Sequence, residues 1–408
     1  SALGTLKSAL ADLQSALSAV NSPATFQQKN ASSSAPAVMT VSAGADAATG
    51  SYSISVEALA AAQSLAVRAT FTSASEVVGT GTLTITRGTT SYTADTSDPV
   101  NTAADTYDGF VAKAGTASST ITIDSTNNTL SGIRDAINAA DIGISATIVN
   151  NGSAYRLALS SDETGAENSF KVDVSDSGDS NNTDGSGLSR LAFNSAAGTA
   201  NVHQTVAAVD ASFTVNGLAL SSKSNVVTDS ITGVNLTLKK TTTASVKIAI
   251  TDNTAGIKSA INTFVAGYNN YVTTLGGLTA YDPSTGASGA LQGDFSTRSI
   301  SGQIRNAISA VSEGWVGSYS RLAEIGITAT STGALAVDDT KLSAALETSI
   351  SSVEGVLTRF ASPSSGSGIK VASLTDTAVQ GTYAVAVSSL ATNGTLSATV
   401  PGAGFPLT

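Results

Sequence analysis

Side chains that could perform catalysis are scarce in this 408-residue sequence, which contains one histidine and no cysteine. A serine–histidine–aspartate arrangement would have to use His203, the single histidine. It stands in the run Asn-Val-His-Gln beside an expected strand, and the G-x-S-x-G pattern of a nucleophile elbow does not occur. We therefore predict a structural or solvent-facing histidine, no catalytic residue and no thiolate chemistry.

Two further short patterns have both a functional and a structural interpretation. Asp338 and Asp339 could be paired catalytic carboxylates, but they precede an expected helix at Thr340, where acidic side chains cap free N–H groups. Gly79-Thr-Gly81 leads into an expected strand and not into a helix, so we interpret it as a hairpin turn and not as a phosphate-binding loop.

A possible calcium loop begins with Asp179, Asn181 and Thr183. Position six of such a loop must be glycine and position twelve glutamate, whereas this chain has Asp184 and Arg190 there. We predict an ordinary polar loop, and the sequence predicts no metal and no cofactor.

Charge and hydropathy exclude two classes of partner. The formal net charge is −10, with 20 lysines and arginines and no basic run longer than Lys239-Lys240. Nucleic-acid binding needs concentrated positive charge, and so does docking on anionic lipid. No apolar run approaches the length of a membrane span of about 18 residues. We therefore expect neither nucleic acid nor a membrane as a partner.

Both ends of the sequence contain apolar residues at alternating intervals of three and four, the pattern of helices that pack along a seam. The N-terminal seam comprises Leu3, Leu6, Leu10, Leu13, Leu17 and Val20, and the second comprises Ile257, Ile261, Phe264, Tyr268, Tyr271 and Leu275. Pro23 should end the first helix. Packing within one chain and packing between chains both remain open for these seams. Further helices are expected over 297–312 and 341–360, after a glycine-rich connection at 278–293.

Between residues 24 and about 250 the apolar period changes to two, which is typical of half-buried strands. A single helix, with Leu130, Ile133 and Ile137 on one face, interrupts them. Residues 93–119 and 173–189 are expected to be loops.

This order predicts an α+β multidomain fold, in which a discontinuous α-helical domain from both ends of the chain holds inserted β-rich head domains. The repeat of 50–56 at 381–387 suggests a further domain near the C-terminus. The expected domains are 1–66 with 254–362 (helical), 67–82 with 205–253 (β-rich), 83–204 (β-rich, outer, with one helix) and 369–408 (the start of an additional β domain). Residues 363–368 are an expected linker.

Several segments resemble, in family order, the bacterial flagellar filament-capping proteins, also called flagellar hook-associated protein 2. The strand segment YSISVEALAAAQ at 52–63 carries the closest resemblance. Similar segments are 3–10, 129–149, 213–217, 233–238, 289–294 and 322–327. The terminal coiled-coil segments of the family have no counterpart here, so we expect a trimmed fragment.

The resemblance implies a non-enzymatic scaffold at the tip of the flagellum, outside the cell, exported by the flagellar type III system. The implied partners include further copies of the chain, in a homo-oligomer that is described for the family as a pentamer. They also include flagellin, which the cap helps to fold and insert and keeps from leaking, and host surface glycans. The two seams would then belong to the helical domain that supplies the assembly contacts. An exported adhesin that binds host glycans or mucin without an assembly role is the alternative, and an extracellular hydrolase is disfavoured by the single histidine.

Overall fold

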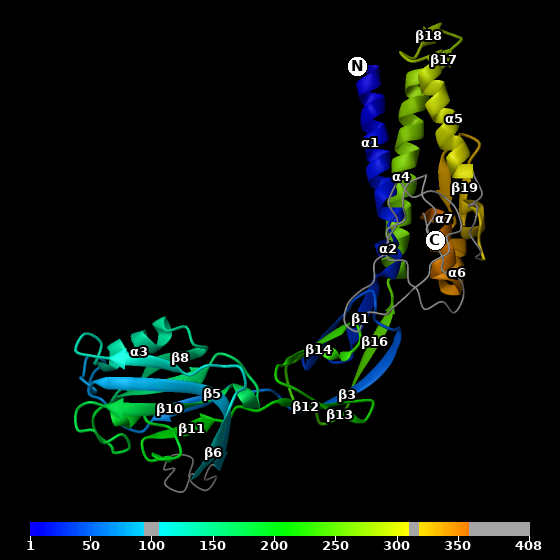
Figure 1. Ribbon diagram of the computed structural model, residues 1–408. Helices are drawn as coiled ribbons and strands as arrows, with labels where there is room; N and C mark the ends of the chain where they lie inside the picture. The colour runs from blue at the N-terminus through cyan, green and yellow to red at the C-terminus, as the bar shows by residue number, and fades with distance from the viewer. Residues whose placement is uncertain (94–105, 310–317, 359–408) are drawn as a thin grey trace, which may run out of the picture. The chain divides into compact units, whose positions relative to one another are not determined.

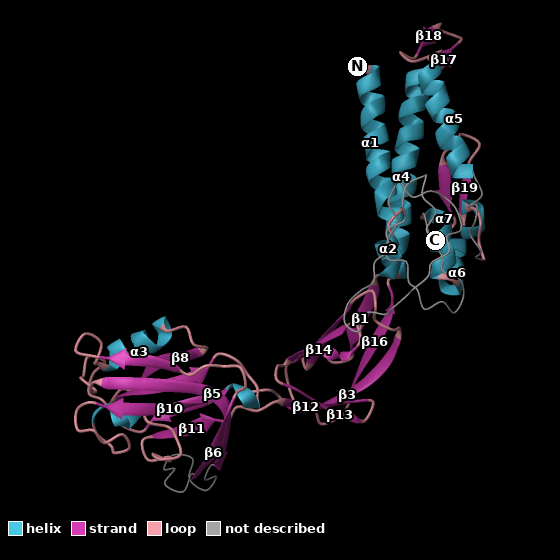
Figure 2. Cartoon of the chain, in the orientation of Figure 1, coloured by secondary structure: helices cyan, strands magenta, loops and turns pink. Residues whose placement is uncertain are grey.

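The computed structural model describes residues 1–93, 106–309 and 318–358. The described residues divide into two units: residues 1–28, 252–309 and 318–358 form the helical unit, and residues 29–251 contain the strand unit. Figure 2 shows mostly helices in the first and mostly strands in the second. The expected fold class, α+β with a discontinuous helical domain and an inserted β-rich head, is confirmed. The segments expected as a linker (363–368) and as an additional domain (369–408) lie outside the described residues.

The N-terminal part of the helical unit consists of α1 (Ala2–Val20) and α2 (Pro23–Gln27). The Ser1 hydroxyl accepts a hydrogen bond from the Gly4 N–H at 3.3 Å and caps α1. Pro23 ends α1 as expected, but it also opens α2, because its missing N–H is not needed in the first turn of a helix.

The long helix α4 (Thr254–Thr279) leads into the rest of the helical unit. The expected glycine-rich connection contains the two-stranded ribbon of β17 (Tyr281–Asp282) and β18 (Ala287–Ser288). The remaining elements are α5 (Phe295–Ser309), the 3-10 turn η3 (Leu322–Ile325), β19 (Ile327–Ala329), β20 (Leu335–Val337), α6 (Asp339–Thr348) and α7 (Ile350–Leu357).

One expected helix, 341–360, is two helices in the structure. Ser349 has an extended backbone with φ −166°, which ends α6. Its hydroxyl accepts a hydrogen bond from the Ser352 N–H at 3.1 Å and so begins α7. The apolar spacing continues through this break, and that is why the sequence pattern did not reveal it.

The chain leaves the helical unit and returns to it at one point. The Asn253 N–H donates to the Gln28 carbonyl oxygen at 3.0 Å, and the Asn253 side-chain amide donates to Oε1 of Gln28 at 3.1 Å. The Asn253 Oδ1 also caps α4 by accepting from the Gly256 N–H at 2.9 Å.

The strand unit contains two hydrophobic cores. The split body, residues 29–60 with 211–251, has a five-stranded sheet in the order β1-β16-β3-β12-β13 and a three-stranded sheet in the order β14-β15-β2. Its strands are β1 (Lys29–Ser33), β2 (Met39–Ala43), β3 (Gly50–Ala58), β12 (Ala211–Val215), β13 (Leu218–Ser222), β14 (Val226–Ile231), β15 (Val234–Leu238) and β16 (Val246–Asp252). Met39, Ile54, Phe213 and Ile248 are fully buried in its core.

The central body, residues 64–206, has two four-stranded sheets. In one, β5 pairs with β6, β7 and β10; the other has the order β11-β4-β9-β8. Leu130, Ile133 and Ile137 of α3 enter its core, as expected. Its elements are β4 (Ser64–Val67), β5 (Gly81–Thr93), β6 (Thr106–Ala112), β7 (Ser119–Ile123), α3 (Leu130–Ala139), β8 (Ile144–Asn150), β9 (Tyr155–Ser161), the 3-10 turns η1 (Ala166–Asn168) and η2 (Gly187–Leu191), β10 (Ser169–Asp176) and β11 (Val202–Val206).

Several expected limits differ from the observed ones. Residues 29–66 do not join the helices, because β1 and β3 pair with β16 and β12, and β4 pairs with β9 and β11 of the central body. The expected loop at 93–119 contains β6, and the loop expected from 173 begins only after β10 ends at Asp176.

Gly79 and Gly81, at the start of β5, do not form the expected hairpin turn. A side chain at Gly81 would collide with the Ser175 carbonyl of β10, and a side chain at Gly79 would lie 2.6 Å from the Leu188 nitrogen. Glycine is required there because the neighbouring backbones approach so closely.

Candidate assembly surface of the helical unit

The two predicted seams meet where α1 packs on α4 (Figure 1). Because successive residues of a helix are about 100° apart, only part of a leucine-rich helix can face one neighbour. The face of α1 that is buried consists of Leu6, Ala9, Leu13, Ala16 and Val20, and that of α4 of Ile257, Ile261, Phe264, Val265, Tyr268, Tyr271 and Leu275.

The structure separates the predicted N-terminal seam into two rows. Leu6 and Leu13 are buried against α4. Leu3, Leu10 and Leu17, seven residues apart and about 60° around the helix from the first row, form a second row. Leu3 is 63% exposed and Leu17 41% exposed, while Leu10 is half-buried. In this leucine row, the described residues leave Leu3 and Leu17 exposed, while Leu10 packs partly against the core.

Ile257, Ile261, Phe264 and Tyr268, the predicted residues of the second seam, are all buried. Burial raises the pKa of the Tyr268 hydroxyl and that of Tyr271, whose rings lie 6.5 Å apart between centroids. Both tyrosines therefore stay neutral at physiological pH and act as packing groups.

Sequence reasoning missed the small residues that let the two helices approach. A methyl group at Gly267 of α4 would lie 2.9 Å from the Cβ of Ala16, and the alanines Ala9 and Ala16 lie in the buried face of α1. The signal was present as two alanines seven residues apart. The heptad pattern counts only large apolar residues, and therefore it did not include these alanines.

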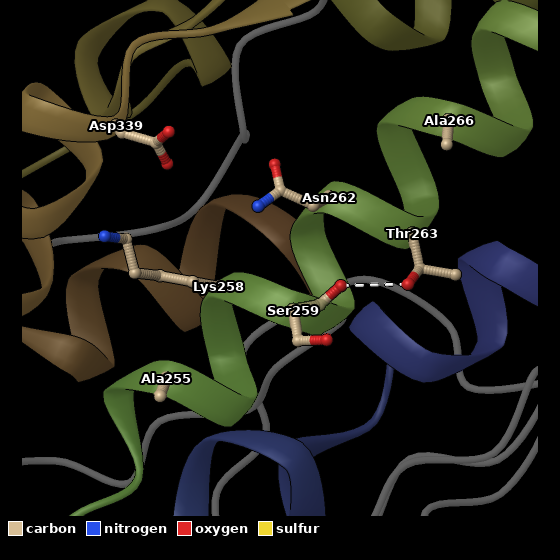
Figure 3. A pocket seen from close by; sticks show the side chains of 7 residues that line it. All are labelled: Ala255, Lys258, Ser259, Asn262, Thr263, Ala266 and Asp339. Atoms are coloured by element: carbon tan, nitrogen blue, oxygen red, sulfur yellow. Dashed lines mark hydrogen bonds between the residues drawn. The ribbon is translucent and has the colours of Figure 1, made fainter.

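A groove beside α4 has a lining of mixed character, to which α6 also contributes (Figure 3). The lining residues are Ala255, Lys258, Ser259, Asn262, Thr263, Ala266 and Asp339. Lys258 Nζ donates to the Ser343 hydroxyl at 2.8 Å. Within the described residues no group of three or more histidine, cysteine, aspartate or glutamate side chains could hold a metal ion. The groove therefore combines apolar surface with a few hydrogen-bonding side chains.

One end of the helical unit carries exposed apolar side chains. The start of α1, the β17–β18 ribbon and the start of α5 share this end (Figure 1). Leu3, Tyr281 at 57% exposure and Phe295 at 81% exposure lie in these elements. Beside them, hydrogen bonds from the Ser284 and Thr285 hydroxyls lower the pKa of Asp282 to about 2, which keeps the ribbon's turn charged.

The residues singled out for possible chemistry have structural surroundings. His203 lies in β11 opposite Ala66 of β4. Asp338 caps α6, since its carboxylate accepts from the Thr340 and Lys341 N–H groups. Asp179 accepts from the Asn181 N–H at 2.9 Å, an ordinary turn within the polar loop.

Within the described residues, no helix combines the length and apolar character that crossing a membrane requires.

Comparison with known proteins points to one group throughout. A family model described as the N-terminus of flagellar hook-associated protein 2 matches residues 1–63, and a model of its C-terminus matches 208–396. Neither model covers 64–207, a stretch that nearly coincides with the central body.

Individual relatives match across both units. The chain is 36% identical over 373 residues to the B-type flagellar hook-associated protein 2 of Pseudomonas aeruginosa, which covers 88% of this chain and 71% of that protein. It is 33% identical over 369 residues to flagellar hook-associated protein 2 of Escherichia coli K12, with the same shares covered. The crystal structure of the D1-D2-D3 domains of the Escherichia coli flagellar cap protein FliD is similar with a TM-score of 0.68 and 33% identity, and covers 87% of this chain and 89% of that one.

Proposed function

Because the chain belongs to the flagellar hook-associated protein 2 family, we propose that it is a subunit of the cap at the tip of a bacterial flagellar filament. The observation that carries this proposal is the similarity to a flagellar cap protein over 87% of the chain, helical and strand units included. The cap subunit is a non-enzymatic scaffold outside the cell, and the flagellar type III system exports it.

The helical unit supplies the assembly contacts in this proposal. Among the described residues of this unit, the exposed apolar side chains include Leu3 and Leu17 of the leucine row (Leu3, Leu10 and Leu17), and Tyr281 and Phe295 at the apolar end. Apolar surface rimmed by polar side chains is typical of sites that bind other proteins. The partners are further copies of the chain, in a pentamer, and flagellin, which the cap helps to fold and insert and keeps from leaking.

Complementation tests the function directly. A cap-deletion strain that carries the complete gene should swim and should stop releasing unpolymerised flagellin into the medium. Continued leakage of flagellin from a strain that makes and exports the protein would refute the proposal. Normal filaments in the deletion strain together with lost attachment to host glycans or mucin would instead favour an adhesin without an assembly role.

Paired variants separate the leucine row from general stability. Leu3→Asp with Leu17→Asp changes side chains that the described structure leaves exposed, so the subunit should fold while filament growth fails. The control is Val149→Asp in β8, a residue of similar exposure at 52% in the central body. If the double variant restores motility as well as the unchanged protein does, the leucine row has no assembly role.

A further inference from the structure

Two short chain segments connect the split body and the central body of the strand unit. The first contains Ala61 and the second Val209, and these two residues exchange backbone hydrogen bonds of 3.0 and 3.2 Å. An isolated pair of extended segments resists bending poorly, since a two-stranded ribbon is only marginally stable. The angle between the bodies therefore needs further contacts if it is to be fixed.

A loop of the central body supplies such contacts through its backbone. The Gly165 N–H donates to the Ala61 carbonyl at 3.2 Å, and the Ala166 N–H donates to Oδ1 of Asp210 at 2.8 Å. The Thr164 hydroxyl donates to the Lys223 carbonyl at 2.8 Å. Residues 163–168 thus hold the connecting segments and the turn after β13 of the split body.

The loop that contains Gly165 lies very close to the backbone at Lys223. Its φ of +102° lies in the region that favours glycine, and a side chain there would come within 2.9 Å of the Lys223 backbone oxygen. A larger residue would have to push the two bodies apart.

Glu167 adds an electrostatic contact to the same loop. Its carboxylate lies 2.7 Å from Lys223 Nζ of the split body and 3.0 Å from Lys113 Nζ of the central body. Lys113 also donates to Oδ1 of Asn168 at 2.6 Å, and the Asn168 amide donates to the Thr164 carbonyl at 2.7 Å. The carboxylate is therefore held in place from the central side and presented to Lys223.

We propose that residues 163–168 are a clasp that fixes the angle between the central and split bodies, and that the Glu167–Lys223 ion pair is its releasable element. Lys223 is 62% exposed, so dissolved ions reach and screen the pair. Low ionic strength closes the clasp and high ionic strength loosens it. This inference does not rest on the proposed function, because it concerns the geometry of the strand unit alone.

The chain contains no cysteine, so two introduced cysteines can be spin-labelled selectively. Val149→Cys in β8 and Leu218→Cys in β13 place one exposed label on each body. At low ionic strength, pulsed electron paramagnetic resonance on the 408-residue chain should give one narrow distribution of label distances. Adding Lys223→Gln or Gly165→Val should broaden or shift it, and Lys223→Arg should preserve it.

Lys171→Gln is the matched control, because Lys171 Nζ lies 2.7 Å from Asp173 and both residues belong to the central body. It should leave the distribution unchanged. Salt at about 1 M, where the Debye length is about 3 Å, should give the unsubstituted chain the distribution of Lys223→Gln. A distribution in Lys223→Gln identical to that of the labelled parent at low salt, or a parent distribution that is already broad, overturns the proposal.

Discussion

Single side chains end and begin the helices of this molecule, and two adjacent aspartates show how differently neighbours can contribute. Asp338 accepts hydrogen bonds from the Thr340 and Lys341 N–H groups at 3.1 and 3.0 Å, whereas Asp339 is exposed in the first turn of α6. We expect Asp338→Ala to lower the free energy of unfolding by about 1 kcal/mol through the lost cap. Asp339→Ala should cost only about 0.3–1 kcal/mol through the helix dipole.

Urea unfolding followed by circular dichroism of both variants measures the difference. Equal losses of stability would show that the carboxylate of Asp338 stabilises α6 only through its charge and not as a cap.

At the scale of single residues, the sequence allowed the helix-capping role of Asp338 to be predicted, because an aspartate directly before a segment with helical apolar periodicity is typical of a helix N-terminus. It did not reveal Glu167. That carboxylate acquires its partners from residues 54 positions before it and 56 after it in the chain, Lys113 and Lys223, and no spacing rule relates such distant residues.

Among the elements, the pairing of α1 with α4 depends on the absence of a side chain at Gly267. We expect Gly267→Leu to lower the free energy of unfolding of the helical unit by about 1–3 kcal/mol, because the added atoms would have to displace Ala16. Gly276→Leu in the same helix is the control, since nothing lies within 4 Å of a side chain there. The better helix propensity of leucine should make that variant neutral or more stable by about 1 kcal/mol or less.

Thermal unfolding of both variants, followed by the helical signal in circular dichroism, tests the pair. A Gly267→Leu variant that melts with the unchanged protein would mean that α1 and α4 are not packed at Ala16.

The elements themselves were largely predictable, since both seams appear as helices and most alternating segments as strands. The rows within a seam were not. A heptad pattern does not show how many neighbouring helices a helix packs against. In the structure, α1 buries Leu6 and Leu13, whereas Leu3 and Leu17 are exposed. β6 escaped prediction because Asp108 and Gly109 interrupt its alternation.

For the whole molecule, the division into two units predicts two separable unfolding reactions. Residues 29–251 make their sheets and both cores among themselves. We expect this segment, produced alone, to fold and to melt at the temperature of the strand unit in the full chain. Its first and last strands, β1 and β16, are neighbours in one sheet, so cutting the chain there leaves no open loop.

Calorimetry of the segment and of the full chain provides the test, and Gly267→Leu should shift only the helical transition. A segment that fails to fold, or one transition that Gly267→Leu shifts as a whole, would contradict independent units.

The discontinuous plan was predictable at this scale because helical periodicity occurs on both sides of the strand periodicity. The exact limits were not, since residues 29–58 are assigned by strand pairing with residues more than 150 positions away, such as Ile54 with Val215. Pairing partners are a property of the folded sheet and not of the local pattern.

The meeting of Gln28 and Asn253 has a consequence for evolution and for engineering. Two hydrogen bonds join Gln28, where the chain leaves the helical unit, to Asn253, where it returns. This pair is therefore an insertion point at which the helical unit can accommodate another domain. Ala61 and Val209, which are paired within the inserted strand unit, form a second insertion point, between the split body and the central body. Replacing the residues between either pair with another domain would leave the α1–α4 packing in place.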